Sequence, residues 1–184
     1  MKLKHLIAAV GVTLSFSSWA VNFTAGDKAP EVKVETYGEI LVKQDDIAYQ
    51  NWDSATMAGK TRVIQAIAGR SAAKALNQPM IKAIIAAQLP DEQYQTTTII
   101  NQSDSIWGTG SFVKSSAEDS KREFQRSSIV LDKDGAVAKA WQLQPKSSMI
   151  AVQSKDGHIL WAKDGELTQP EIDKVISLIK SDLQ

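Results

Sequence analysis

The spacing of hydrophobic positions in the middle of the chain predicts a βαβ unit. Thr61–Ala68 is short, rich in β-branched residues and bounded by glycines, which indicates a buried strand. Apolar residues then recur every three or four positions, which indicates a helix; Pro79 removes an amide donor, so we expect a kink or a new start there. Tyr94–Asn101 predicts the second strand. The two strands should be parallel, with a right-handed crossover.

The segment before this unit predicts a small N-terminal hairpin. Residues 31–35 alternate between charge and valine, as a half-buried strand does, and Gly38 should turn the chain into a second apolar run. The polar stretch 44–59 predicts a loop or short helix. Three large side chains should hold this stretch to the core: Tyr49, Trp52 and Met57.

Two similar segments, 127–141 and 147–161, predict two further hairpins. Each has a pair of serines, an apolar run, Lys-Asp-Gly and a closing tryptophan, Trp141 or Trp161. An Asp-Gly turn between apolar runs is the strongest short-range hairpin signal. We therefore expect antiparallel sheet in this half of the chain.

Two helices complete the predicted order. Residues 111–122 form a polar helical pattern before the first of these segments. At the end of the chain, Thr168 and Glu171 form a capping box with Pro170 inside the first turn. An apolar stripe at i, i+3, i+4 and i+7 follows, so this helix should lie across the sheet.

Composition narrows the class of protein. The 184 residues are 43% hydrophobic and 23% charged, as in one soluble domain, and none is cysteine. Disulfides, thiol catalysis and cysteine-ligated metal sites are therefore excluded. The 21 basic and 21 acidic residues leave no basic excess, so no nucleic-acid partner is expected.

The first 20 residues have the pattern of a cleavable signal peptide. Lys2 and Lys4 precede an apolar run at 6–16, and Ser18 and Ala20 are the small residues that a signal peptidase reads. The run is too short to span a bilayer, and no later stretch approaches that length. We expect cleavage after Ala20, a single mature domain at 21–184 and export to the periplasm. The mature chain then carries 19 basic and 21 acidic residues.

The predicted order, with a Gly-x-x-Ala-Pro entry at 26–30, resembles the thioredoxin-like fold. This fold is an α/β three-layer sandwich with a mixed sheet, here with an N-terminal β-hairpin extension and a C-terminal helix. Five strings, at 58–63, 67–71, 94–99, 112–116 and 161–165, resemble the YtfJ family of bacterial periplasmic proteins. That resemblance implies a thioredoxin-like protein of unestablished function.

Departures from working thioredoxins bear on function. Where a redox thioredoxin carries Cys-x-x-Cys, this chain has Gly69-Arg70-Ser71, and Ser148 stands where the cis-proline is expected. Disulfide exchange and cysteine peroxidase chemistry are therefore excluded, and no cofactor or metal is indicated. The resemblance favours a binding or interaction module at the former active-site edge, for a periplasmic protein, a peptide or a small anionic ligand.

Glycine-containing loops after two predicted strands supply the candidate ligand-binding residues. If the strands are adjacent and parallel, both loops emerge at one edge, where amide donors and an arginine fork favour an anion. Alternatively, the glycines only permit tight turns, and the arginine pairs with a surface carboxylate. The candidates are Arg70, Ser71, Gly108, Gly110 and Ser148.

Ser71 and Lys74 offer a different function, a hydrolase or acyl-transfer enzyme. They match Ser-x-x-Lys, in which a neutral lysine deprotonates the serine, and this requires Ser71 Oγ within about 3 Å of Lys74 Nζ. The same spacing recurs at Ser111 and Ser177, as chance predicts. Otherwise Ser71 is a helix cap and Lys74 is solvated.

Three remaining features have ordinary structural interpretations beside functional ones. Residues 132–135 read Asp-Lys-Asp-Gly, as a calcium loop can begin, but they also form a turn signal. His158 is the one histidine after residue 20 and should be exposed beside Gly157. The tryptophans at 107, 141 and 161 could line a groove, although core positions are commoner.

Overall fold

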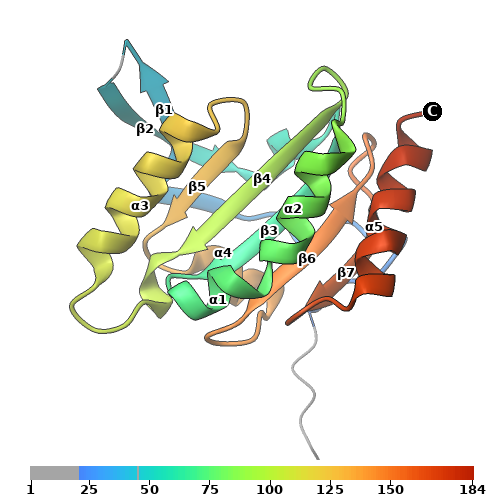
Figure 1. The fold of residues 1–184 in the computed structure, drawn as a ribbon. Helices are drawn as coiled ribbons and strands as arrows, with labels where there is room; N and C mark the ends of the chain where they lie inside the picture. The colour runs from blue at the N-terminus through green and yellow to red at the C-terminus, as the bar shows by residue number, and fades with distance from the viewer. Residues whose placement is uncertain (1–20, 45) are drawn as a thin grey trace, which may run out of the picture.

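A mixed sheet of seven strands forms the middle layer of the molecule (Figure 1). The computed structural model describes residues 21–44 and 46–184; the predicted signal peptide, 1–20, lies outside the described residues. The strand order is β2-β1-β5-β4-β3-β6-β7. The strands are β1 (Lys33–Lys43), β2 (Asp46–Asp53), β3 (Thr61–Ala68), β4 (Tyr94–Asn101), β5 (Ser128–Asp132), β6 (Ser148–Gln153) and β7 (Ile159–Asp164).

Helices cover both faces of this sheet. The α-helices are α1 (Ser71–Leu76), α2 (Gln78–Ala87), α3 (Gly110–Glu123), α4 (Ala136–Trp141) and α5 (Gln169–Asp182). Three helical elements, α1–α2, α3 and α5, lie on one face, and α4 lies on the other (Figure 1). This is the predicted three-layer α/β sandwich. No helix among the described residues is long and apolar enough to cross a membrane.

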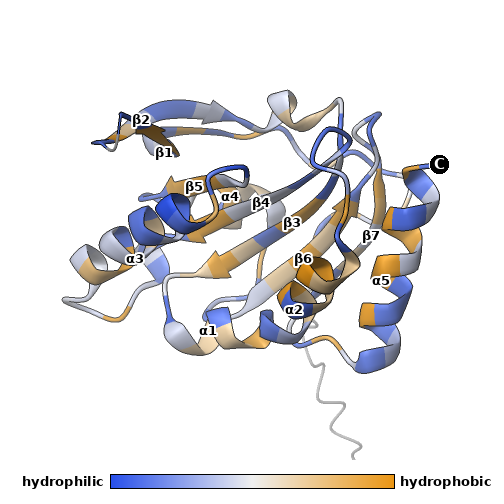
Figure 2. Ribbon diagram, turned by 45° about the horizontal axis from the view of Figure 1, so that its top comes forward, coloured by the Kyte–Doolittle hydropathy of each residue, from blue (hydrophilic) through white to orange (hydrophobic). Residues whose placement is uncertain are grey.

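Side chains that alternate along the central strands pack into separate hydrophobic cores on the two faces of the sheet. Ile64, Ala66 and Ile99 pack with Trp141 on the α4 face. On the opposite face, one cluster lies under α2 and α5, and a second lies under α3. Figure 2 shows the hydrophobic residues concentrated on the central strands and α2, whereas α3 is mostly hydrophilic.

The βαβ unit is confirmed. β3 and β4 have the predicted bounds and pair in parallel, and β6 runs antiparallel on the other side of β3. The helix restarts as expected, because α1 ends at Leu76 and α2 begins at Gln78 with Pro79 in its first turn. Asn77 lies at the break and is buried.

The hairpin predicted at 127–141 is wrong, although the one at 147–161 is confirmed as β6 and β7. After β5 the chain forms the helix α4 instead of a returning strand. The carboxylate of Asp132 accepts the amides of Ala136 and Val137 at 3.0 and 2.9 Å, as a helix cap does. Three alanines in α4 favour the helix further, whereas the second segment continues with Ile159 and Leu160 into a strand.

The N-terminal hairpin exists, but Gly38 is not its turn. β1 continues through Gly38 with an irregularity in its pairing to β2, and Tyr37 and Gly38 have φ angles of 67° and 77°. The stretch predicted as a loop forms β2, followed by a short 3-10 turn at Ser54–Met57. Trp52 is buried as expected, and β2 is an edge strand of the sheet.

The capping box of α5 predicts an acid-dependent stability. Hydrogen bonds from Lys163 and from the Thr168 amide lower the pKa of Glu171 to about 2. Because this pKa is depressed, the stabilisation is complete above about pH 4.5 and is lost as the pH falls toward 2. Glu171→Gln should lower the free energy of unfolding by about 1 kcal/mol at pH 7, and the difference from the native protein should disappear near pH 2.

Urea denaturation at several pH values would measure this difference. Glu166→Gln is the matched control, because Glu166 is exposed and precedes the same helix. A constant difference between Glu171→Gln and the native protein across the pH range would contradict the assignment.

Candidate functional site

The carboxyl ends of β3, β4 and β5 meet the start of β6 at one edge of the sheet. In the strand register, Ala68 lies opposite Asn101, Asn101 opposite Asp132, and Ile67 opposite Ser148. The three parallel strands end together, and α/β proteins commonly bind ligands at such an edge. It is also the edge that the resemblance to thioredoxins indicated.

A cavity of about 600 Å³ opens at this edge, on the side of α4. Apolar side chains from the sheet and from α4 form much of its lining, among them Ala66, Ile99, Val137 and Met149. Ser148 also lines it and is only 1% exposed. Its hydroxyl has no hydrogen-bond partner among the described residues. A buried hydroxyl without a hydrogen-bond partner costs free energy, so we expect a ligand or a water to supply that partner.

Backbone contacts position the serine. The Ala68 amide donates to the Ser147 carbonyl at 3.0 Å, and the Gly165 amide donates to the Ser148 carbonyl at 2.7 Å. Both neighbours of β6, namely β3 and β7, therefore hold this segment in place. The Ser147 hydroxyl donates to Asp164, which leaves the Ser148 hydroxyl as the unpaired one of the two.

Arg70 is engaged in an ion pair. Its Nε and Nη2 both lie 3.0 Å from Oδ1 of Asp104, and Oδ2 of Asp104 accepts the Lys146 amide at 2.6 Å. The pair joins the loops that follow β3 and β4 to the loop that precedes β6. The arginine fork therefore pairs with a protein carboxylate, the arrangement that we gave as the alternative to anion binding. Asp104 itself lines the cavity.

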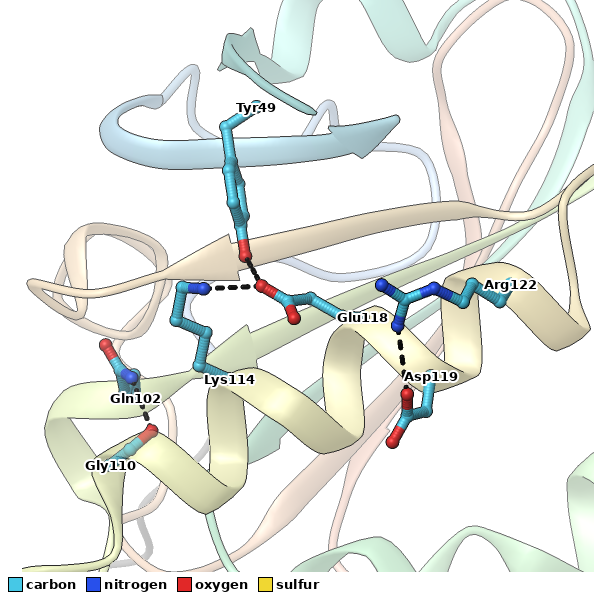
Figure 3. A network of polar contacts seen from close by, with 7 residues as sticks. All are labelled: Tyr49, Gln102, Gly110, Lys114, Glu118, Asp119 and Arg122. Carbon is cyan, nitrogen blue, oxygen red and sulfur yellow. Dashed lines mark hydrogen bonds and ion pairs between the residues drawn. The ribbon is translucent and has the colours of Figure 1, made fainter. Parts of the chain in front are cut away.

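The other candidate residues lie elsewhere. Gly110 backs onto Gln102, whose side chain donates to the Gly110 carbonyl at 2.7 Å (Figure 3), and Gly108 is exposed in a turn with φ +81°. Neither glycine lines the cavity. The structure therefore does not bring the five predicted binding residues together: Ser148 faces the cavity, while Arg70 and Ser71 border a groove on the opposite face.

Ser71 and Lys74 do not have the geometry of a Ser-Lys pair. Both side chains are exposed on α1, and no hydrogen bond joins them in the described part of the chain. Ser71 is also not the helix cap, because Arg70 occupies that position and no side chain caps the helix. Nothing in this arrangement would activate Ser71 as a nucleophile.

Acidic side chains outnumber basic ones in the cavity lining. Asp132 and Asp164 line the cavity, and neither forms an ion pair with a described side chain. Asp164 accepts the Gln144 amide at 2.8 Å, and Asp132 caps α4. Lys139 is the one described cationic residue in the lining, and its ammonium group donates to the Asp134 carbonyl.

The remaining sequence candidates are structural. Asp132 uses its oxygens on α4, and the described residues contain no group of three or more side chains that could hold a metal ion. His158 is exposed, and its Nδ1 lies 3.0 Å from the Gly26 carbonyl oxygen. Trp141 is fully buried, as a core tryptophan should be, whereas Trp107 is 98% exposed.

A polar cluster that the sequence reasoning missed fastens α3 to the hairpin (Figure 3). Tyr49 of β2 donates its hydroxyl to Glu118, and the Lys114 ammonium group contacts the same carboxylate oxygen. Burial raises the pKa of Tyr49 to about 12, and the hydrogen bond to Glu118 raises the pKa of Lys114. Tyr49 therefore stays neutral and Lys114 stays charged at neutral pH, which suits a clamp better than a proton-transfer site.

Comparison with known sequences confirms the predicted resemblance. A family model described as a bacterial protein of unknown function, YtfJ, matches residues 23–182. The uncharacterized protein YtfJ of Escherichia coli is 41% identical over 180 residues, which cover 98% of each chain. An uncharacterized protein of Haemophilus influenzae is 46% identical over 179 residues, which cover 97% of each.

Solved structures confirm the predicted fold. A thioredoxin-like superfamily protein superposes with a TM-score of 0.57 at 16% identity, covering 85% of this chain and 96% of that one. The thioredoxin domain of a thiol-disulfide oxidoreductase from Bacteroides vulgatus also gives 0.57, at 13% identity, covering 89% and 100%. Identities this low establish a shared architecture and nothing about shared chemistry.

Proposed function

Because the chain belongs to the YtfJ family of bacterial proteins and carries a thioredoxin-like fold without cysteine, we propose that it is exported to the periplasm, binds a ligand there and has no redox activity. The signal-peptide pattern of residues 1–20 supports export. The thiols through which this fold exchanges disulfides are missing, and Arg70 and Ser71 occupy the strand-to-helix junction instead.

The observation that carries the binding proposal is the Ser148 hydroxyl. This hydroxyl is buried and unpartnered among the described residues, and Ser148 is one of the residues that line the cavity at the carboxyl ends of the parallel strands. An apolar residue would fit this position at lower cost, because burying an unpaired hydroxyl is unfavourable. A ligand that exchanges a hydrogen bond with the hydroxyl would supply the missing partner.

The lining indicates the class of ligand. A volume of about 600 Å³ suits a small molecule, and its apolar walls with a few polar groups are typical of such sites. The carboxylates of Asp132 and Asp164 in the lining outnumber Lys139, its one described cation, and disfavour a small anion. We therefore expect a neutral or cationic molecule with an apolar body and a hydroxyl or amine that reaches Ser148.

Replacing Ser148 with alanine tests this role through two opposite effects. Ser148→Ala should leave the ligand-free protein as stable as before or up to about 1 kcal/mol more stable, since it removes an unsatisfied buried group. It should weaken ligand binding roughly tenfold, the value of one hydrogen bond. Urea denaturation measures the first effect. Two measurements report the binding. Native mass spectrometry of protein isolated from the periplasm detects a bound small molecule, and titration with the small-molecule fraction of a periplasmic extract compares the affinity of the variant with that of the native protein.

A blocking variant identifies the cavity as the site. Ala138 lines the cavity from α4, so Ala138→Phe should abolish the bound mass, while Ala86→Phe, on the exposed side of α2, should retain it. Ligand at 100 times its dissociation constant should raise the melting temperature by roughly 5 to 10 °C in the control only. Equal binding by both variants, or no bound small molecule in any of them, would refute the proposal.

A further inference from the structure

The apolar surface of the helix α2 extends beyond the face that packs on the sheet. Met80 and Ile84 are buried in the cluster beneath α2 and α5. Ile81 and Ile85, one position further along, form a second stripe beside the first; Ile81 is half-buried and packs against the same cluster, whereas Ile85 is 60% exposed. A helix that is apolar on more than one face is normally covered on each of them. Within residues 21–44 and 46–184, the part of the second stripe at Ile85 therefore lacks a covering element.

This stripe forms one wall of a groove of about 1030 Å³. The opposite wall is α3, and Thr96, Thr98 and Ile100 of β4, which lies between the two helices in Figure 1, line the floor. The cores beneath α2 and beneath α3 are separate clusters on this face of the sheet. The main apolar residues of the two walls are Ile81, Ile85, Ile106, Phe112, Val113 and Phe124.

Exposed large hydrophobic residues gather at this groove. In the described part of the chain there are five, and four of them line it: Ile85, Ile106, Phe112 and Phe124. The fifth, Trp107, directly follows Ile106 in the loop before α3. Exposed apolar residues on a monomeric protein are normally scattered, and a contiguous set marks an interaction surface.

The α1–α2 wall of the groove is positively charged. Residues 71–87 contain two lysines and no acidic residue, and both Lys74 and Lys82 line the groove. Neither forms an ion pair with a described side chain, while Arg70 is neutralised by Asp104. Glu123 lies on the α3 wall. An occupant of matching charge therefore carries acidic groups on the side that faces α1 and α2.

The backbone of the floor is unavailable to an added strand. β4 pairs with β3 on one side and with β5 on the other, so its amides and carbonyls are already used. Recognition must then proceed through side chains, as when an amphipathic helix lies between two helices. The concave shape also suits a helix better than the surface of a bilayer.

We propose that this groove docks an amphipathic helix of a partner protein. The apolar stripe of that helix packs against Ile85 and Phe112, and acidic residues beside the stripe pair with Lys74 and Lys82. The surface lies on the opposite face of the sheet from the Ser148 cavity, so each proposal can be tested independently of the other.

Two synthetic helical peptides of about 18 residues test the proposal. Both carry the same leucine stripe, flanked by glutamates in one and by lysines in the other. Fluorescence anisotropy should show about tenfold tighter binding of the glutamate peptide to the mature protein. The double variant Lys74→Glu/Lys82→Glu should reverse this preference. Ala138→Phe, which fills the cavity, should leave peptide binding unchanged.

Ile85→Glu supplies the second arm. It places a carboxylate in the groove and should weaken binding of the glutamate peptide at least about tenfold. Ala86→Glu, one residue away, should leave this binding unchanged. Far-UV circular dichroism checks that both variants fold.

Equal binding of the two peptides, or binding of neither, would overturn the proposal. So would a native dimer that Ile85→Glu converts to monomer, because a second copy would then occupy the groove. Binding to phosphatidylglycerol vesicles that Ile85→Glu abolishes would assign the surface to lipid instead.

Discussion

Replacing Trp141 with alanine should lower the free energy of unfolding by about 3 to 5 kcal/mol. Trp141 is fully buried and packs edge-to-face against Phe23, with ring centroids 5.5 Å apart. Its indole Nε1 donates to the Pro30 carbonyl at 2.8 Å. The substitution removes this packing and leaves the partly buried Pro30 carbonyl without its donor. Because α4 has only two buried residues, Val137 and Trp141, the helix should also detach from the sheet.

Trp107→Ala is the matched control, since it deletes the same side chain from a position that is 98% exposed. Its effect on stability should stay within about 0.5 kcal/mol. Urea denaturation monitored by far-UV circular dichroism measures both variants. A loss below about 1 kcal/mol for Trp141→Ala would show that α4 is not anchored through this residue.

Local patterns were sufficient where neighbouring residues decide the structure. The β-branched run of β3, the restart at Pro79 and the capping box of α5 were all predicted and are confirmed. The two Lys-Asp-Gly segments show the limit of this reasoning. Both contain the same turn signal, but the carboxylate of Asp132 caps a helix in the first, and the residues that follow each glycine favour different structures.

The candidate site shows the same division between local and distant information. Parallel strand ends were predicted to gather at one edge, and they do. The pairing of Arg70 with Asp104, 34 residues away, depends on how the loop after β4 folds back, which periodicity does not reveal. The spacing of Ile81 and Ile85 in the sequence could have predicted a second apolar stripe on α2. The neighbouring stripe that faces the core has more apolar residues, and the helix was predicted from that one alone.

The Arg70–Asp104 pair lies between the two proposed binding surfaces. Asp104 lines the cavity on the α4 face, and Arg70 lines the groove on the opposite face. In redox thioredoxins the corresponding strand-to-helix junction carries the reactive thiols. Here an ion pair that is partly buried on both sides closes that junction.

Gly38→Ala should be among the most destabilising substitutions in the sheet and should lower the free energy of unfolding by roughly 2 to 4 kcal/mol. Gly38 has a φ angle of +77°, and an added Cβ would lie 2.1 Å from the Gln50 carbonyl oxygen of β2. The pairing of β1 with β2 must shift to admit it. Because Tyr49 reaches Glu118 from this same strand, hydrogen exchange should rise in the hairpin and in α3 together.

Gly59→Ala separates backbone strain from the clash. Gly59 also has a positive φ, +100°, but an added Cβ would meet no atom within 4 Å, so this control should cost only about 1 kcal/mol. The difference between the two variants in urea denaturation therefore measures the close approach of β1 to β2. Equal losses would mean that strain alone explains Gly38. Faster exchange in the hairpin with unchanged exchange in α3 would show that the Tyr49–Glu118 contact does not hold α3 in place.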